Sequence, residues 1–343
     1  MSLNRILAIL AAVLFLLSAL TYRNSVQRAE RFERGQPFLA NLNPDEIAEI
    51  LIVKGEQTTH LERAPDEFVV TDAQGYPARN DAVNRFVRQV LEIGLDKRVG
   101  SGDDLQQELE LVEAGGETID VMFKAASETP MVHFLVGKAA KDGGGNYVRR
   151  VDTDPSEIFL TSSGVYLNTS QDDFLKKELV DVRQSDVQAI RGRDFVVEEQ
   201  GGALQLTGLP SGKKENASKM AEVTSALSGL RFTKHYLADA AQLGGLNFDA
   251  ALTVQLKDQS SYQVAVATED DKHYLKIRGF HSVQEIAVNP DDSEEEVREK
   301  SEILARADEI RKFNAFHGSW VYEVSQSVAD KIRLTKKDLI EDA

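Results

Sequence analysis

The feature that most constrains the fold of this chain is an order of predicted elements that occurs twice. A buried strand is predicted at residues 47–53 and again at 187–191, and a short hairpin follows each of them. Amphipathic helices then begin at Asn80 and at Ser218, with apolar residues at helical spacing. Six elements recur in the same order, which indicates a duplicated structural unit, although few residues are identical between the copies.

Paired strands complete each copy. Residues 118–124 and 131–137 alternate between apolar and polar side chains, and residues 252–256 and 262–267 do the same in the second half. Alternation with a period of two is typical of antiparallel strands that bury one face. Each copy is therefore predicted to be an antiparallel sheet with one packed helix.

Two further stretches lie outside the repeat. A polar stretch separates the copies, and the chain ends with a helix capped by Ser293 and Glu296 and a closing strand that begins at Trp320. We therefore predict an α+β fold, in which an N-terminal transmembrane helix precedes two tandem β-rich α/β repeats and a C-terminal helix. The predicted parts are a transmembrane anchor at 1–22, a stalk at 23–40, a first repeat at 41–171, a linker at 172–185, a second repeat at 186–288, and a C-terminal helix with its closing strand at 289–343.

The N-terminal segment predicts attachment to a membrane. Residues 6–20 are almost all apolar, and their number approaches the roughly 20 residues that span a bilayer. A cleaved signal peptide is the alternative, although no clean small-residue cleavage site follows the apolar core. Arginines in the flank at 23–34 favour a cytoplasmic body, but a large domain can cross the membrane regardless of such charges.

Charge and cysteine content narrow the possible functions. With 40 Lys and Arg against 56 Asp and Glu, the chain of 343 residues has a formal net charge of −16. The field of such a chain repels phosphate backbones, so no nucleic-acid partner is expected. The chain has no cysteine, which excludes disulfides, thiolate nucleophiles and thiolate metal sites.

No motif in the chain predicts catalysis, a cofactor or a metal ion. The glycines at 143–145 lack the Gly-Lys-Ser/Thr ending of a phosphate loop and suit a tight turn between strands. The six histidines occur singly, and Asp152 and Asp154 do not match a calcium loop. Ser211 and Lys214 have the spacing of a Ser-x-x-Lys motif, but its companion motifs are missing. We therefore predict that the protein is not an enzyme and uses no cofactor.

A set of basic and aromatic residues occurs at matching places near the end of each copy. Such a set predicts a surface that recognises a partner or a glycan. The alternative is that these are strand residues that point outward at every second position. The candidate partner-surface residues are Tyr147, Arg149, Arg150, Tyr274, Lys276 and Arg278.

Short motifs spread over nearly the whole chain resemble a bacterial protein family. They are LNPDEI at 42–47, GYPA at 75–78, VG at 136–137, YVR at 147–149, DDFL at 172–175 and WVY at 320–322. Members of that family are single-pass, extracytoplasmic proteins that carry a domain of unknown function, and they are often encoded beside an ABC transporter of the gliding-motility auxiliary type. The resemblance implies an inner-membrane protein whose soluble body lies on the periplasmic side and works with the membrane subunits of a transporter.

Together these patterns lead to three functional hypotheses. The first is a non-catalytic, membrane-anchored accessory or scaffold subunit of an ABC-type transporter complex, whose partners are the membrane, through the N-terminal helix, and the transporter's membrane subunits. The alternative is an extracytoplasmic module that binds a cell-envelope glycan or lipid, which a concave apolar or aromatic pocket would favour. The third is a hydrolase whose residues converge only in the folded chain.

Overall fold

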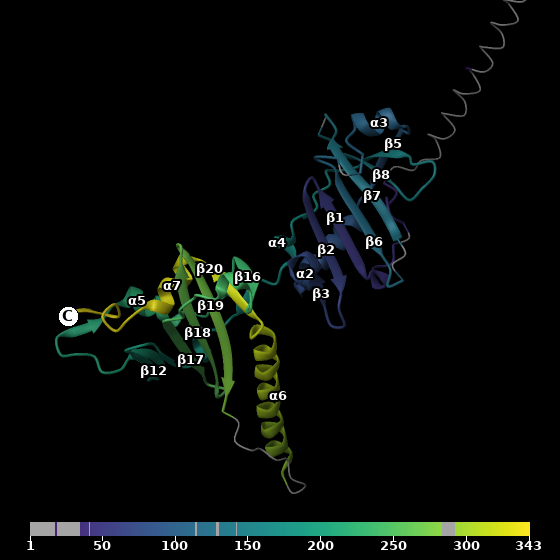
Figure 1. The fold of residues 1–343 in the computed structure, drawn as a ribbon. Coiled ribbons are helices and arrows are strands. Elements are labelled where there is room, and N and C mark those ends of the chain that lie inside the picture. The colour runs from purple at the N-terminus through teal and green to yellow at the C-terminus, as the bar shows by residue number, and fades with distance from the viewer. Residues whose placement is uncertain are drawn as a thin grey trace, which may run out of the picture. The chain divides into compact units, whose positions relative to one another are not determined.

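The chain divides into two compact units, Met1–Lys176 and Lys177–Ala343, each built on its own sheet (Figure 1). The computed structural model describes Ser18 and residues 35–40, 42–113, 115–127, 130–141, 143–282 and 292–343. The boundary between the units falls inside the stretch predicted as a linker, but that stretch has regular structure. It holds most of helix α4 (Gln171–Phe174), strand β10 (Glu178–Val180) and the 3₁₀ turn η3 (Gln184–Asp186).

The first unit contains one antiparallel sheet of nine strands, in the order β4-β3-β2-β1-β6-β7-β8-β9-β5. Its strands are β1 (Glu49–Lys54), β2 (Gln57–Arg63), β3 (Phe68–Val70), β4 (Tyr76–Pro77), β5 (Leu95–Gly100), β6 (Ile119–Lys124), β7 (Pro130–Ala139), β8 (Asn146–Arg150) and β9 (Ile158–Thr161). Besides α4, its helices are α2 (Asn80–Leu91) and α3 (Asp103–Glu108), with 3₁₀ turns η1 (Pro44–Glu46) and η2 (Thr71–Ala73).

Helix α2 covers one face of the first sheet. Val83, Phe86 and Val90 are buried along one side of the helix, as their helical spacing predicts. The ring of Phe86 lies 6.3 Å from that of Phe123 in β6 and 5.7 Å from that of Phe174 in α4. Burial of one such side chain contributes about 1.5–3 kcal/mol, so these rings anchor the helix on the sheet.

The opposite face of the first sheet is covered by α3 and the segment that follows it. Leu109 and Leu111 of that segment pack with Leu135 of β7. Gly137 permits the close approach, because a Cβ atom at this position would lie 2.3 Å from the carbonyl oxygen of Leu109. The backbone N–H of Lys138 donates to the same oxygen, at 3.2 Å. This cover is therefore fixed directly to the middle of the sheet.

The second unit contains an antiparallel sheet of eight strands, in the order β13-β12-β11-β17-β18-β19-β20-β16. Its strands are β11 (Val187–Arg191), β12 (Val196–Gln200), β13 (Ala203–Leu206), β16 (Lys234–Leu237), β17 (Ala250–Leu256), β18 (Ser260–Glu269), β19 (Lys272–His281) and β20 (Trp320–Val324). Two small antiparallel pairs complete the unit, β10 with β15 (Leu230–Arg231) and β14 (Lys213–Glu215) with β21 (Ile340–Asp342). The remaining elements are α5 (Ala217–Thr224), α6 (Glu294–His317), α7 (Gln326–Arg333) and the turn η4 (Ala241–Leu243).

Helix α7 packs on β17, β18 and β19, while α6 runs beside β19 (Figure 1). Arg306 ties α6 to the start of β18, because its Nε lies 2.9 Å from a carboxylate oxygen of Asp258 and its guanidinium donates to the Tyr262 hydroxyl at 3.3 Å. Farther along the helix, a Cβ atom at Gly279 would lie 3.1 Å from the side chain of Ile310. The helix and the strand are therefore in close contact.

The two sheets share one strand order. The eight strands β3-β2-β1-β6-β7-β8-β9-β5 of the first unit correspond, in sequence order and in position, to β13-β12-β11-β17-β18-β19-β20-β16 of the second. Helix α2 precedes β5 as α5 precedes β16. The units differ most in the connection before the strand β9 or β20, because residues 151–157 suffice in the first unit whereas the second inserts α6.

The predicted α+β class was wrong. Strands account for 39% of the described residues and helices for 25%, and all four sheets are antiparallel, so the fold is mostly β. The helices α2 and α5 have only 12 and 8 residues, whereas β7, β18 and β19 have 10 each. The sequence patterns located α2, α5 and α6, but they missed α3, α4 and α7 and did not indicate how much of the intervening chain joins the sheets.

The predicted transmembrane helix receives no support from the structure. Among the described residues, no helix is both long enough and apolar enough to cross a membrane. The predicted anchor at residues 1–22 lies outside the described residues, apart from Ser18.

Candidate functional site

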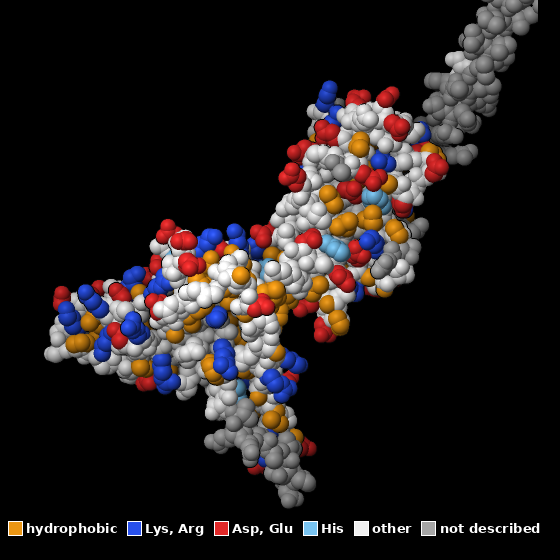
Figure 2. Space-filling model, in the orientation of Figure 1, with side chains coloured by type: hydrophobic (Ala, Val, Ile, Leu, Met, Phe, Trp, Pro, Cys, Tyr) orange, Lys and Arg blue, Asp and Glu red, His pale blue; other side chains and the backbone are white. Residues whose placement is uncertain are grey.

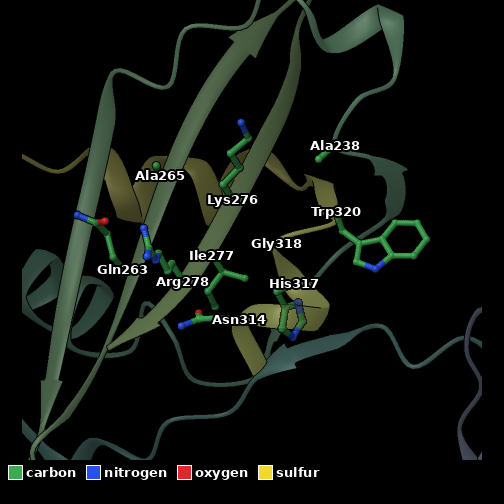
Figure 3. Close-up of a pocket in the computed structure, with 10 residues that line it drawn as sticks. All are labelled: Ala238, Gln263, Ala265, Lys276, Ile277, Arg278, Asn314, His317, Gly318 and Trp320. Atoms are coloured by element: carbon green, nitrogen blue, oxygen red, sulfur yellow. The ribbon is translucent and has the colours of Figure 1, made fainter. Parts of the chain in front are cut away.

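The candidate site is a cavity of about 490 Å³ in the second unit, where the end of α6 meets the sheet (Figure 3). Strands β18 and β19 form one wall, and the last turn of α6 and the first residue of β20 form another. Gln263, Lys276, Arg278, Asn314, His317 and Trp320 are among the residues that line it. All of the lining residues belong to the second unit.

The cavity exists because the neighbour of β19 changes along its length. Strand β20 pairs with β19 only as far as Leu275, opposite Tyr322. Beyond that point α6 takes over: the amide of Asn314 accepts from the backbone N–H of Gly279 at 2.8 Å and donates to its carbonyl oxygen at 2.7 Å. Ile277 lies between Leu275, which pairs with β20, and Gly279, which is bound by Asn314. Because alternate residues of an antiparallel strand direct their backbone N–H and C=O groups to the same side, those of Ile277 point toward the cavity.

Two cations stand on the exposed face of β19 at the cavity. Lys276 and Arg278 are two positions apart, so their side chains project from the same face of the sheet, opposite Ala265 and Gln263 of β18. The Lys276 ammonium lies 4.5 Å from the centre of the Phe248 ring, and the Arg278 guanidinium 5.1 Å from that of Phe280. Within the part of the chain that the structure describes, neither cation has a carboxylate partner within 4.0 Å, although the chain carries a net charge of −16.

The other wall of the cavity is held by aromatic packing. The buried imidazole of His317 shares a hydrogen bond of 2.6 Å between its Nδ1 and the Tyr322 hydroxyl, and it packs 4.1 Å from the Phe313 ring. Trp320 is only 7% exposed and packs against His235, and its indole points away from Lys276 and Arg278 (Figure 3). These aromatic side chains form the wall of the cavity, whereas its positive charge comes from Lys276 and Arg278 of β19.

The basic residues predicted in the first unit are engaged internally. Arg149 is only 8% exposed, and its guanidinium donates to the carbonyl oxygen of Leu111 at 2.7 Å and to the Ser156 hydroxyl at 3.1 Å. Burial lowers the pKa of Arg149. Arg150 donates to both carboxylate oxygens of Asp152, at 2.9 and 2.5 Å.

The two predicted tyrosines also belong to packed clusters. Tyr147 packs against the cluster formed by Leu109, Leu111, Leu135 and Ile158. Tyr274 is 7% exposed and packs with Leu243 and Val321. Of the six predicted surface residues, the structure therefore brings only Lys276 and Arg278 together at a cavity, while Arg149 and Tyr274 are buried.

A cluster of two carboxylates and an imidazole in the first unit has the side-chain types of a metal site. Glu113, Asp120 and His133 place one ligand atom each within 4.8 Å of one another. His133 Nε2 lies 2.8 Å from Asp120 Oδ1, and this hydrogen bond raises the pKa of His133. The positive charge of Arg149 acts on Glu113 and Asp120 from nearby. These carboxylates already balance an arginine and a histidine, so a divalent cation fits the cluster poorly.

Comparison with protein families shows a similarity to a family of unknown function. The model of a family described as a domain of unknown function, DUF4340, matches residues 69–251. The match begins in β3 and ends in β17, so it includes parts of both units, but Ala238 is the one lining residue of the cavity that it contains. No curated protein and no solved structure matches the chain.

Proposed function

This chain belongs to the DUF4340 family, and we propose that it is a non-catalytic accessory or scaffold subunit of a membrane complex of the ABC-transporter type. The observation that supports a binding role is the pair Lys276 and Arg278 at the cavity. The lining side chains include two cations, two amides and an imidazole that is bonded to Tyr322. Such a set can hold a partner group, but it offers no nucleophile with an adjacent base.

The proposed location is the inner membrane, with the body on the periplasmic side. The resemblance of motifs such as LNPDEI and DDFL to extracytoplasmic proteins supports it, as does the apolar segment at residues 6–20. The proposed partners are the membrane subunits of the transporter, and nucleic acid is not among them because of the net charge of −16.

Affinity purification of the full-length chain from its native membrane in mild detergent, with mass spectrometry of the recovered proteins, tests this role. Near-stoichiometric transporter subunits would support it, and recovery of the chain alone would contradict it. A variant with Lys276→Glu and Arg278→Glu is the matched comparison, because both side chains are exposed and substitutions at exposed positions are expected to change stability little. Loss of the subunits from this variant alone would place the contact at the cavity.

A second candidate function is a module that binds a cell-envelope glycan or lipid. The cavity favours it, because a volume of about 490 Å³ lies within the roughly 300–1,000 Å³ of small-ligand sites. On the face in view, Lys and Arg side chains also gather over the second unit (Figure 2). Equilibrium dialysis of the full-length chain against solubilised envelope fractions tests this function, and the absence of any retained glycan or lipid would contradict it.

A further inference from the structure

We infer that the cavity beside β19 binds a small ligand that carries a carboxylate or a phosphate group, and that Lys276 and Arg278 hold this group. The inference deepens the second candidate function and rests on it. It names the chemistry of the ligand and the two side chains that recognise it.

The spacing of the two cations suits a single oxyanion. Residues two apart in a strand have Cα atoms about 7 Å apart on one face, so flexible side chains from both positions can converge on one group. An arginine fork can donate two parallel hydrogen bonds to a carboxylate or phosphate, while a lysine contributes a point charge. Both cations rest against phenylalanine rings and not against carboxylates, so an incoming anion displaces no ion pair among the described residues.

The remaining lining suits the neutral part of such a ligand. Gln263 lies opposite Arg278 in the register and offers an amide donor and acceptor. Ala238, Ala265 and Gly318 add small, mostly apolar surface. A volume of about 490 Å³ holds a sugar or a headgroup, whereas a protein partner needs roughly 800 Å² of surface on each side.

The first unit shows that the sheet does not by itself produce this arrangement. Arg149 follows Tyr147 by two positions in β8, as Lys276 follows Tyr274 in β19. Yet Arg149 donates hydrogen bonds to Leu111 and Ser156 and is covered by the segment that follows α3. The corresponding position is closed in one unit and open in the other, which identifies the second unit as the binding unit.

Isothermal titration of the full-length chain with two anionic probes, glucuronate and sn-glycerol 3-phosphate, tests the inference. The neutral counterparts glucose and glycerol serve as ligand controls. We expect at least one anionic probe to bind, and Lys276→Gln or Arg278→Gln to weaken it about tenfold or more, since each removes a charge-assisted hydrogen bond. Lys272→Gln is the matched control, because Lys272 is exposed on the same strand but outside the cavity, and it should leave the affinity unchanged.

The two probes distinguish the sources of the anion. Binding of glucuronate alone indicates an acidic glycan, and binding of glycerol phosphate alone indicates a phosphate headgroup. The inference is overturned if neither probe binds at millimolar concentration, if glucose or glycerol binds as well as its anionic counterpart, or if the double variant Lys276→Gln with Arg278→Gln retains full affinity. Such a result would leave the retention of a glycan or lipid in equilibrium dialysis untouched, so failure of this inference and failure of the second candidate function are separate outcomes.

Discussion

The two units place a similar pair of side chains at corresponding points of their two sheets, but the surroundings of the pair differ. In the first unit, Arg149 is buried beneath the segment that follows α3, and Tyr147 packs against the cluster that contains Leu109 and Leu111 of that segment. In the second, Tyr274 is packed in the same way, but Lys276 remains exposed beside a cavity. A basic residue at this position therefore becomes structural or accessible according to the cover above it.

The covers differ in length and in attachment. The first includes the six residues of α3, and its continuation is bonded to β7 through the carbonyl oxygen of Leu109. The second includes the three residues of η4 and packs with Tyr274 and Val321, short of Arg278. The second unit instead has the helix α6, whose C-terminal end lines the cavity.

The largest expected effect concerns the helices α2 and α5, which hold corresponding places in the two units. Phe86→Ala should lower the free energy of unfolding of the first unit by about 3–5 kcal/mol, because it leaves a cavity between two other rings. Val223→Ala in α5 should cost the second unit about 1–3 kcal/mol, because a smaller side chain is removed. Hydrogen–deuterium exchange in urea reads both units at once. Equal losses would show that the two helices contribute equally.

Substitutions of Arg149 and Lys276 should differ in how much they lower the free energy of unfolding. Arg149→Met removes two hydrogen bonds and leaves Leu111 and Ser156 without this donor, so we expect a loss of about 2–4 kcal/mol in the first unit. Lys276→Met is the matched variant and should change the stability of the second unit by no more than about 0.5 kcal/mol. Exchange protection of β8 and β19 measures both. The comparison fails if Arg149→Met is as neutral as Lys276→Met.

A smaller effect is expected where α6 is fastened to β19. Asn314→Ala removes both hydrogen bonds to the backbone of Gly279 and should cost about 1–3 kcal/mol. Trp320 is the single tryptophan of the chain and is buried beside the cavity, so its fluorescence reports the urea midpoint of the second unit. Asn314→Asp keeps the acceptor for the Gly279 N–H but turns a carboxylate oxygen toward the Gly279 carbonyl oxygen, so it should lower the midpoint at least as much as Asn314→Ala. An unchanged midpoint in both variants would show that the amide does not fasten the helix.

Local patterns predicted individual elements well. The helix expected to begin at Asn80 is α2, and the capping box of Ser293 and Glu296 is confirmed at the start of α6. Each of these two signals is formed by residues only a few positions apart in the chain, so the sequence alone reveals it. Ser211 and Lys214 lie at β14 and the turn before it, so the Ser-x-x-Lys spacing is not on a helix.

Contacts between distant segments were beyond such patterns. Alternation along β19 predicted that Lys276 and Arg278 project outward, but the same rule failed for Arg149, whose burial depends on Leu111, 38 residues earlier. The sequence patterns did not identify Asn314 and His317 as lining residues. Asn314 contacts Gly279, which lies 35 residues earlier in the chain, and no sequence motif indicates such a contact. The pairing of Lys213 with Asp342 spans 129 residues, and no local pattern predicts the two strands that it joins.

The smallest expected effect is a pH dependence confined to the first unit's charged cluster. The hydrogen bond with Asp120 raises the pKa of His133, with Glu113 and Asp152 acting in the same direction, burial opposing them and the cation Arg149 nearby. A raised pKa in the folded state means that this stabilisation is complete below the unfolded value of about 6.5 and is lost as the pH rises through the folded pKa. Unfolding midpoints from acidic to alkaline pH should therefore fall more for the wild type than for His133→Gln, which does not titrate. Parallel profiles for the two proteins would show that the pair is not charged in the folded state, and that the buried Arg149 alone balances the carboxylates.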